Sequence, residues 1–128
     1  MSFLDRLPFL TFDDLPASAR YQKSDIVHWL VAEYACELLE QDPDAAISKM
    51  RQTYDRFWRK PGFLAQPLVD LWDRLLDGPP DEIIQVLRRD DDRGAHMRQI
   101  MPCQDLLSDA VRPQLAAAAS RILAQRPT

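Results

Sequence analysis

Residues 24–41 most constrain the fold of this chain, because they read as a helix that is apolar on nearly every side. One stripe at helical spacing consists of Ile26, Val27, Leu30, Val31, Tyr34 and Leu38. Much of the opposite side is covered by Trp29, Ala32, Cys36 and Leu39, and a narrow polar strip holds Glu33, Glu37 and Glu40. This pattern predicts a central helix that other helices surround. If the face of Trp29 and Cys36 is exposed instead, it is a contact surface for a partner.

The rest of the chain also divides into helical lengths, separated by three glycines and ten prolines, and no long segment alternates with period two. Asp42 and Pro43 form a helix start, Ser24 is the expected N-cap of the first helix, and Gly78 ends the third. The further helices are expected at about 43–60, 63–77, 80–89, 93–101 and 109–125. We therefore expect an all-α fold, a compact bundle of five or six short-to-medium helices.

The domain organisation follows from length and composition. A chain of 128 residues with 46% hydrophobic and 28% charged residues fits one globular domain, residues 1–128, in which residues 1–23 are largely irregular apart from a turn or two of helix around 11–19. Cys36 and Cys103 form no paired motif, and Asp5 and Arg6 interrupt any leader peptide. No membrane span is expected, because no run of 18 uncharged apolar residues occurs. These features predict a cytoplasmic protein, and the arginine- and alanine-rich composition suggests a bacterial one.

Residues 49–60 carry five cations against one acid, interleaved with aromatic residues. On an α-helix, Ile47, Met50, Tyr54, Phe57 and Trp58 share a core-facing arc. Lys49, Arg56 and Lys60 form a row on the opposite side, and Arg51, Asp55 and Arg59 form an i, i+4 ladder. The cationic row is a candidate contact surface for an acidic protein or for phosphates. With a net charge of −4, the whole chain does not offer a generic phosphate-binding surface.

Residues 88–99, RRDDDRGAHMRQ, concentrate reactive side chains. Arg89 and His96, with six residues between them, are the candidate catalytic pair, and their spacing resembles the arginine-to-histidine motif of HEPN-type ribonucleases, which cleave RNA in a dimer. The acids between them would repel an RNA phosphate. A structural interpretation also fits: the aspartates cap a helix that begins near Arg93, and Arg88 and Arg89 meet the carbonyls that end the preceding helix.

No metal or cofactor is expected. The Asp-x-Asp pair of Asp90 and Asp92 does not continue as a calcium loop, since the positions for glycine and glutamate hold Ala95 and Met101. The two histidines and two cysteines have no zinc-type spacing, and no phosphate loop, Rossmann fingerprint or Gly-x-Ser-x-Gly motif occurs.

These observations predict a small, non-enzymatic protein-binding module with a regulatory role, of the antitoxin, immunity-protein, chaperone or assembly-subunit type. The expected binding residues are Lys49, Arg56, Lys60 and Trp29, and the expected partner is a protein. Two alternatives remain open: a nucleic-acid-binding regulator that uses the cationic row, and a HEPN-like ribonuclease. The sequence leaves the choice between a monomer and a homodimer open as well.

Overall fold

The computed structural model describes residues 1–127, which contain seven α-helices, four 3₁₀ or π-helical turns and no strand. The α-helices are α1 (Phe3–Arg6), α2 (Lys23–Gln41), α3 (Pro43–Thr53), α4 (Gln66–Asp77), α5 (Pro80–Leu87), α6 (Asp92–Gln99) and α7 (Val111–Ala124). The shorter turns are the 3₁₀ turns η1 (Leu7–Phe9), η2 (Phe12–Asp14) and η3 (Ala17–Ala19) and the π-helical turn η4 (Tyr54–Trp58). The all-α class predicted from the sequence is confirmed.

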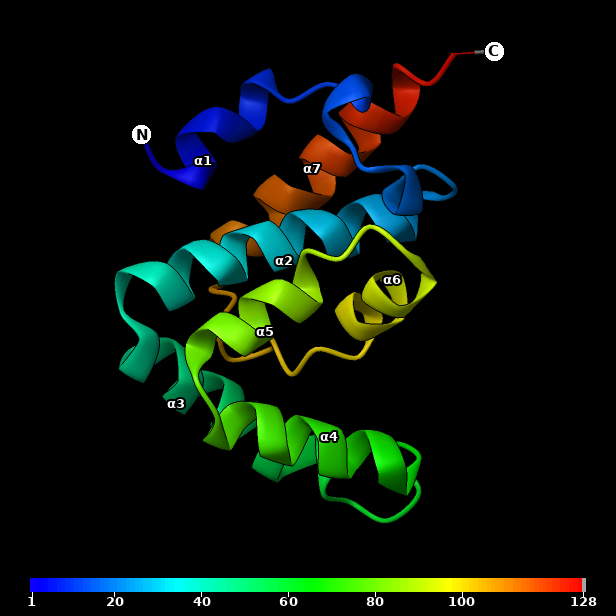
Figure 1. Cartoon of the computed structure of the whole chain (residues 1–128). Coiled ribbons are helices and arrows are strands. Elements are labelled where there is room, and N and C mark those ends of the chain that lie inside the picture. Colours follow the sequence, from blue (N-terminus) through cyan, green and yellow to red (C-terminus); the bar gives the residue numbers. More distant parts are fainter. Residues whose placement is uncertain (128) are drawn as a thin grey trace.

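Helix α2 runs through the middle of the molecule (Figure 1). It contacts α7 on one side, α5 and α6 on another, and α1 and α3 near its C-terminal half. Its residues Ile26, Leu30 and Cys36 have no exposed surface. The prediction of a central helix is therefore confirmed, and the physical reason is the one that its pattern implied: a helix apolar on most sides is stable only when neighbours cover it.

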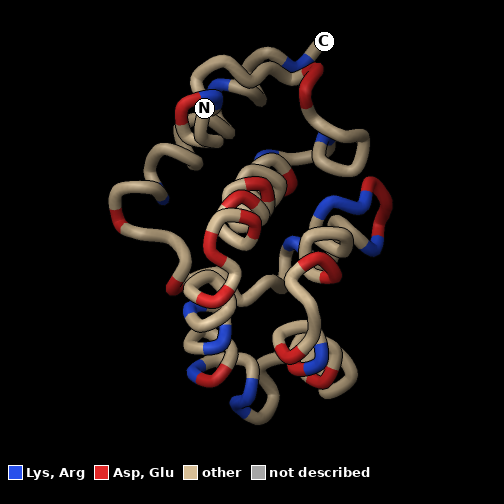
Figure 2. Tube along the Cα trace, turned by 60° about the vertical axis from the view of Figure 1, so that its left-hand side comes forward, with Lys and Arg blue, Asp and Glu red and all other residues tan. Residues whose placement is uncertain are grey.

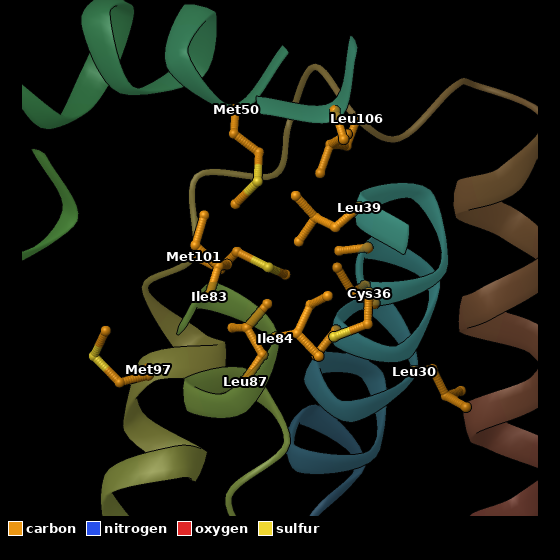
Figure 3. Packing of buried hydrophobic residues seen from close by; sticks show 14 of the residues in the cluster. Leu30, Cys36, Leu39, Met50, Ile83, Ile84, Leu87, Met97, Met101 and Leu106 are labelled. Carbon is orange, nitrogen blue, oxygen red and sulfur yellow. The ribbon is translucent and has the colours of Figure 1, made fainter. Parts of the chain in front are cut away.

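The core is rich in flexible, sulfur-containing side chains. Figure 3 shows Met50 from α3 above Met101, which lies beside Ile83 of α5, while Met97 of α6 and Cys36 of α2 lie on opposite sides of this group. Unbranched methionine adapts to irregular gaps between helices that do not run parallel. This packing joins α2, α3, α5 and α6 to the segment that follows α6.

Most of the predicted helix ends are close to the observed ones. The Asp42 carboxylate accepts a hydrogen bond of 3.3 Å from the Ala45 N–H at the start of α3, and α4 ends just before Gly78. The expected N-cap Ser24 is wrong: the N-cap is Gln22, two residues earlier, and the Asp25 carboxylate accepts a 3.0 Å bond from the N–H of Gln22. An acid in the first turn of a helix also complements its positive end.

Residues 1–23 differ most from the expectation of a largely irregular segment. They form α1 and three 3₁₀ turns, and they bury Phe3, Leu7, Leu15 and Ala19 in the core. The prolines keep each piece short, and contacts from distant elements hold the pieces in place. For example, Arg121 of α7 donates to the carbonyl oxygens of Leu7 and Leu10, at 2.9 and 2.8 Å. The turns expected around residues 11–19 are present.

Within residues 1–127, no helix is long and apolar enough to cross a membrane.

Candidate functional site

A tight turn follows α3 and η4 at residues 60–63, at the lower end of the molecule in Figure 1. The Phe63 N–H donates a 3.1 Å hydrogen bond to the carbonyl oxygen of Lys60, and Gly62 has φ +78°. Proline at the second position and a positive-φ glycine at the third define a type II turn. The Lys-Pro-Gly-Phe sequence therefore reverses the chain and returns Phe63 to the end of η4.

Phe63 stacks on the aromatic side chains of η4 while almost half of it, 48%, stays exposed. Its ring centroid lies 6.1 Å from that of Phe57, with an angle of 29° between the rings, and 5.1 Å from that of Trp58. Both separations fall in the range of favourable aromatic pairs. The exposed ring is thus in contact with two aromatic side chains of η4.

The π-helical turn sets which aromatic residues face inward. The Arg59 N–H bonds to the Tyr54 carbonyl oxygen five residues earlier, at 3.2 Å. The Tyr54 hydroxyl donates to the Val69 carbonyl oxygen at 3.1 Å, and the Trp58 indole N–H donates to the Ile100 carbonyl oxygen at 2.9 Å. Tyr54 and Trp58 are buried, as expected from the sequence, whereas Phe57 is only half-buried. Single π-helical turns often occur at functional sites.

Two cations flank the stacked rings. The Arg56 guanidinium lies 4.8 Å from the Phe57 ring centroid, and the Lys60 ammonium lies 5.6 Å from it. Both distances allow cation–π attraction. Arg56, Phe57, Lys60 and Phe63 together are called the aromatic–basic patch below. Phe63 was not predicted from the sequence to have a role, although the Pro-Gly dipeptide before it is a signal for the turn that places it.

The three cations of the predicted row have different surroundings. Arg56 is held by Asp105, both of whose carboxylate oxygens accept from it at 3.0 Å. Lys49 is exposed and lines a separate pocket of about 190 Å³ beside Leu38 and Leu106. Lys60 is at the patch. Within residues 1–127, neither lysine makes an ion pair.

The expected Arg51–Asp55–Arg59 ladder is half right. Arg59 pairs with Asp55 at 3.2 Å, but Arg51 turns to α4 and pairs with Asp73 and Asp77, at 2.7 and 2.6 Å. A distant pair of acids on a packed neighbour competes better for a guanidinium than one acid on the same exposed face, because it offers two strong hydrogen bonds. The cations of α3 and η4 and the acids of α4 consequently lie together at one end of the molecule (Figure 2).

The other proposed contact face is not open. Cys36 is fully buried, and burial raises the pKa of its thiol to about 12. Trp29 is half-buried and packs against the core. A contact surface at Trp29 and Cys36 requires that both side chains are exposed, and Cys36 is not. A binding role for Trp29 stays a prediction.

Residues 88–99 form the turn after α5 and the whole of α6, as the structural interpretation expected. The Asp91 carboxylate caps α6 by accepting from the Gly94 N–H at 2.8 Å, and it pairs with the Arg89 guanidinium at 2.6 Å. His96 is exposed on α6. The structure gives Arg89 an acidic partner in this turn, and a catalytic role for Arg89 and His96 stays an untested prediction.

The central side chain of this region is Arg98, which sequence reasoning did not single out. It is 3% exposed and donates to the carbonyl oxygens of Leu87 and Arg89, at 2.9 and 2.8 Å, and to the Ser18 hydroxyl at 2.9 Å. Arg88 and Arg89 were expected to contact the carbonyl oxygens at the end of α5. Arg98 makes these contacts instead, at the last residue of α5 and in the turn that follows it. Arg88 instead bridges Glu33 and Glu40 of α2, at 3.5 and 3.0 Å.

Among the described residues, no group of three or more histidine, cysteine, aspartate or glutamate side chains is placed to hold a metal ion. No protein-family model, no curated protein and no solved structure matches this chain. The chemistry of the aromatic–basic patch is therefore the basis for assigning a function.

Proposed function

We propose that this chain is a non-enzymatic, cytoplasmic protein-binding module that contacts its partner through the aromatic–basic patch. The observation that carries the proposal is the Phe63 ring, almost half exposed, stacked on Phe57 and Trp58 and presented by a rigid turn. Protein interfaces concentrate their binding energy in such well-supported aromatic anchors, with charged groups at the rim. Small bacterial proteins of the antitoxin, immunity, chaperone or assembly-subunit type act in this way.

The charges around the patch indicate what the partner offers. The exposed ring needs an apolar pocket, and the unpaired Lys60 beside it favours an acidic residue at the pocket's rim. Such a charge contributes to the association rate and to specificity more than to affinity. The patch therefore fits a protein surface with an apolar pocket and at least one carboxylate next to it.

A nucleic-acid partner is the second candidate, because an exposed aromatic ring next to a lysine can also stack on a base. Nucleic-acid affinity depends mainly on the number of phosphates that cations neutralise. Here Arg51, Arg56 and Arg59 are already bound to acids of the same chain. Few cationic side chains near the patch are therefore available to contact phosphates, and this favours a protein partner.

A photo-reactive phenylalanine analogue at position 63, introduced into the full chain in its native host, tests the proposal. We expect crosslinking to one protein species in stoichiometric amount. The analogue at position 21 is the matched control, since Tyr21 is an exposed aromatic residue elsewhere on the surface. Crosslinking to nucleic acid, or to no macromolecule, would contradict the proposal.

The purified partner then allows a quantitative test. Phe63→Ser should weaken binding about 30-fold, the effect of removing an aromatic anchor, and Lys60→Glu should mainly slow association. Tyr21→Ser should bind like the wild type. Arg56 is not a suitable position for this test, because its loss also releases Asp105 and the segment that follows α6.

A further inference from the structure

A pocket of about 190 Å³ lies where the C-terminal end of α2 meets the start of α3 (Figure 1). Leu38 of α2, Ala45 and Ala46 of α3, and Leu106 form its apolar part. Ala46 and Leu106 are buried and form the floor of the pocket, whereas Ala45 is exposed at its edge. The pocket is large enough for one apolar side chain, because a cavity of about 150 Å³ already holds a benzene ring.

The charged groups at this pocket leave one cation without a partner. The polar lining residues are Gln41, Asp42 and Lys49, and all three are exposed. The Asp42 carboxylate is bound to the Ala45 N–H, and the carboxylate of Glu40, close by on α2, pairs with Arg88 at 3.0 Å. Within residues 1–127, Lys49 makes no ion pair. The group that complements the charge of this pocket is therefore a carboxylate that reaches Lys49.

The pocket lies on the same side of α3 and η4 as the aromatic–basic patch. Leu106, in the floor of the pocket, directly follows Asp105. The Asp105 carboxylate accepts hydrogen bonds from the Thr53 hydroxyl at 2.8 Å and from the Arg56 guanidinium of the patch at 3.0 Å. Residues 105–106 therefore connect the pocket to the patch along one side of α3 and η4. Lys49 is at the pocket end of this side, which is the cationic row predicted from the sequence.

One protein interface of ordinary size is large enough to include the pocket and the patch. Ala45 at the pocket and Phe57 at the patch are separated by about twelve residues of helix, or roughly 18 Å. A specific interface takes about 800 Å² from each partner, which corresponds to a contact roughly 30 Å across. A partner that covers the patch with an interface of this size therefore reaches the pocket as well.

We propose that the partner of the aromatic–basic patch inserts an apolar side chain into this pocket and places a neighbouring carboxylate against Lys49. This inference rests on the proposed function, because it concerns the same partner. The two proteins then anchor each other in both directions: Phe63 enters a pocket of the partner, and a side chain of the partner enters the pocket of this chain. Strong anchors on the two sides of an interface commonly lie opposite one another in this way.

Crosslinking from two positions tests whether one partner reaches both places. A photo-reactive phenylalanine analogue is introduced into the full chain in its native host at position 41, the exposed edge of the pocket, or at position 63. We expect both to crosslink to the same protein, at two different peptides. The peptide reached from position 41 should contain an apolar residue with an aspartate or glutamate within one helical turn of it. The analogue at position 85 is the matched control, since Gln85 is an exposed glutamine of α5.

The outcomes separate the two proposals. If position 63 crosslinks to a protein that position 41 does not reach, the inference is overturned and the proposed function stands. A crosslink from position 41 to a second copy of this chain, or to a peptide without an acidic residue, also overturns the inference. If position 63 crosslinks to no protein, the proposed function fails, and the inference fails with it.

Binding measurements with the purified partner test the pocket itself. Ala45→Phe, which fills the pocket from its exposed edge, should weaken binding about tenfold. Lys49→Glu should weaken it about fivefold, and this effect should decrease at high salt because the contact is between charges. The matched controls are Ser48→Phe, at an exposed position of α3 that does not line the pocket, and Lys23→Glu, at an exposed lysine where α2 begins. Both should bind like the wild type, and circular dichroism checks that every variant is folded.

A replacement in the partner identifies the side chain that occupies the pocket. Serine in place of the apolar residue found by the crosslink from position 41 should weaken binding to the wild type, but should not weaken binding to Ala45→Phe any further. Ala45→Phe and Phe63→Ser act at separate places, so their fold-changes should multiply in the double variant. Unchanged binding in Ala45→Phe together with weakened binding in Phe63→Ser would overturn the inference alone. Unchanged binding in both would overturn the proposed function as well.

Discussion

Arg98 carries a buried positive charge whose direct partners are two carbonyl oxygens and one hydroxyl. Burial lowers the pKa of Arg98, while nearby acids, Asp90 first among them, oppose the shift. Asp90 also accepts from the Ser18 N–H at 2.8 Å, so Ser18 lies between the two charges. This one side chain therefore links the end of α5, helix α6 and the turn η3.

Replacing Arg98 should destabilise the protein more than any loss of an exposed arginine. Arg98→Met leaves two carbonyl oxygens and a hydroxyl without their donor, and the expected loss in the free energy of unfolding is about 3 kcal/mol. Arg93→Met, at an exposed position of the same helix, should change it by less than about 0.5 kcal/mol. Urea unfolding measures both. Equal effects of the two substitutions would show that the buried contacts contribute little.

His28 should make stability depend on pH. Burial lowers the pKa of His28; the charge of Asp25 opposes the shift, and the charge of Arg98 adds to it. Its Nδ1 atom is buried and has no hydrogen-bond partner within residues 1–127. Because the unfolded chain then binds the proton more readily than the folded one, stability should fall as the pH drops below about 6.5, the unperturbed value.

The measurement is urea unfolding of the wild type and His28→Gln at a series of pH values from above 7 to about 5, a range in which histidine titrates. His28→Gln should not show this decline. Its free energy of unfolding should therefore be closer to that of the wild type above pH 7 than at about pH 5. The same slope in both proteins would contradict the assignment to His28.

At the scale of helices, the sequence predicted those elements whose signals are local. The apolar pattern of residues 24–41, the Asp42-Pro43 start and the Gly78 end all act within one or two turns, and each corresponds to an observed boundary or burial. Of residues 1–23, only the turns around 11–19 were expected from the sequence; α1 and η1 were not, and the segment as a whole is held by contacts with Glu37, Arg98 and Arg121 far along the chain.

The candidate site was only partly predictable for the same reason. The sequence indicated a candidate site at the cations and aromatic residues of 49–60. The side of the helix on which each of these residues lies was predicted for a regular α-helix. The π-helical turn η4 contains an i to i+5 bond between Tyr54 and Arg59, which changes the register of the residues after it. Phe63 becomes part of the patch through the turn at Gly62, outside the helix that the pattern described.

Gly94 of α6 lies against the turn that joins α5 to α6, and we expect its replacement by alanine to have an unusual effect on stability. Alanine normally stabilises a helix by about 1 kcal/mol relative to glycine. A Cβ atom at position 94, however, would lie 2.1 Å from the Arg89 carbonyl oxygen, and this backbone atom cannot move aside without shifting the turn. Gly94→Ala should therefore destabilise the protein by about 2 kcal/mol.

Thermal and urea unfolding of Gly94→Ala check this sign. Ala95→Gly, at the next position of α6, is the matched control, and it should show the ordinary helix-propensity loss of about 1 kcal/mol. A stabilised Gly94→Ala would mean that the turn before α6 adapts to the methyl group.

At the scale of the whole molecule, the aromatic–basic patch and the N-terminal segment depend on different parts of the fold. The aromatic–basic patch is held by α3, η4 and their contacts with Val69 and Ile100. The turns of the N-terminal segment rest on α2 and α7. The segment places Phe3, Leu7, Leu15 and Ala19 in the core that the later helices build, so both ends of the molecule share one core.

This arrangement requires that the N-terminal segment is part of the cooperative fold. Leu15 is 2% exposed in the core, and Tyr21, six residues later, is 70% exposed. Leu15→Ala should lower the free energy of unfolding by about 3 kcal/mol, whereas Tyr21→Ala should stay within about 0.5 kcal/mol of the wild type. Urea unfolding, followed by both tryptophan fluorescence and circular dichroism, should show one transition shifted in Leu15→Ala. If Leu15→Ala left the transition midpoint unchanged, the N-terminal segment would be only loosely attached to the core.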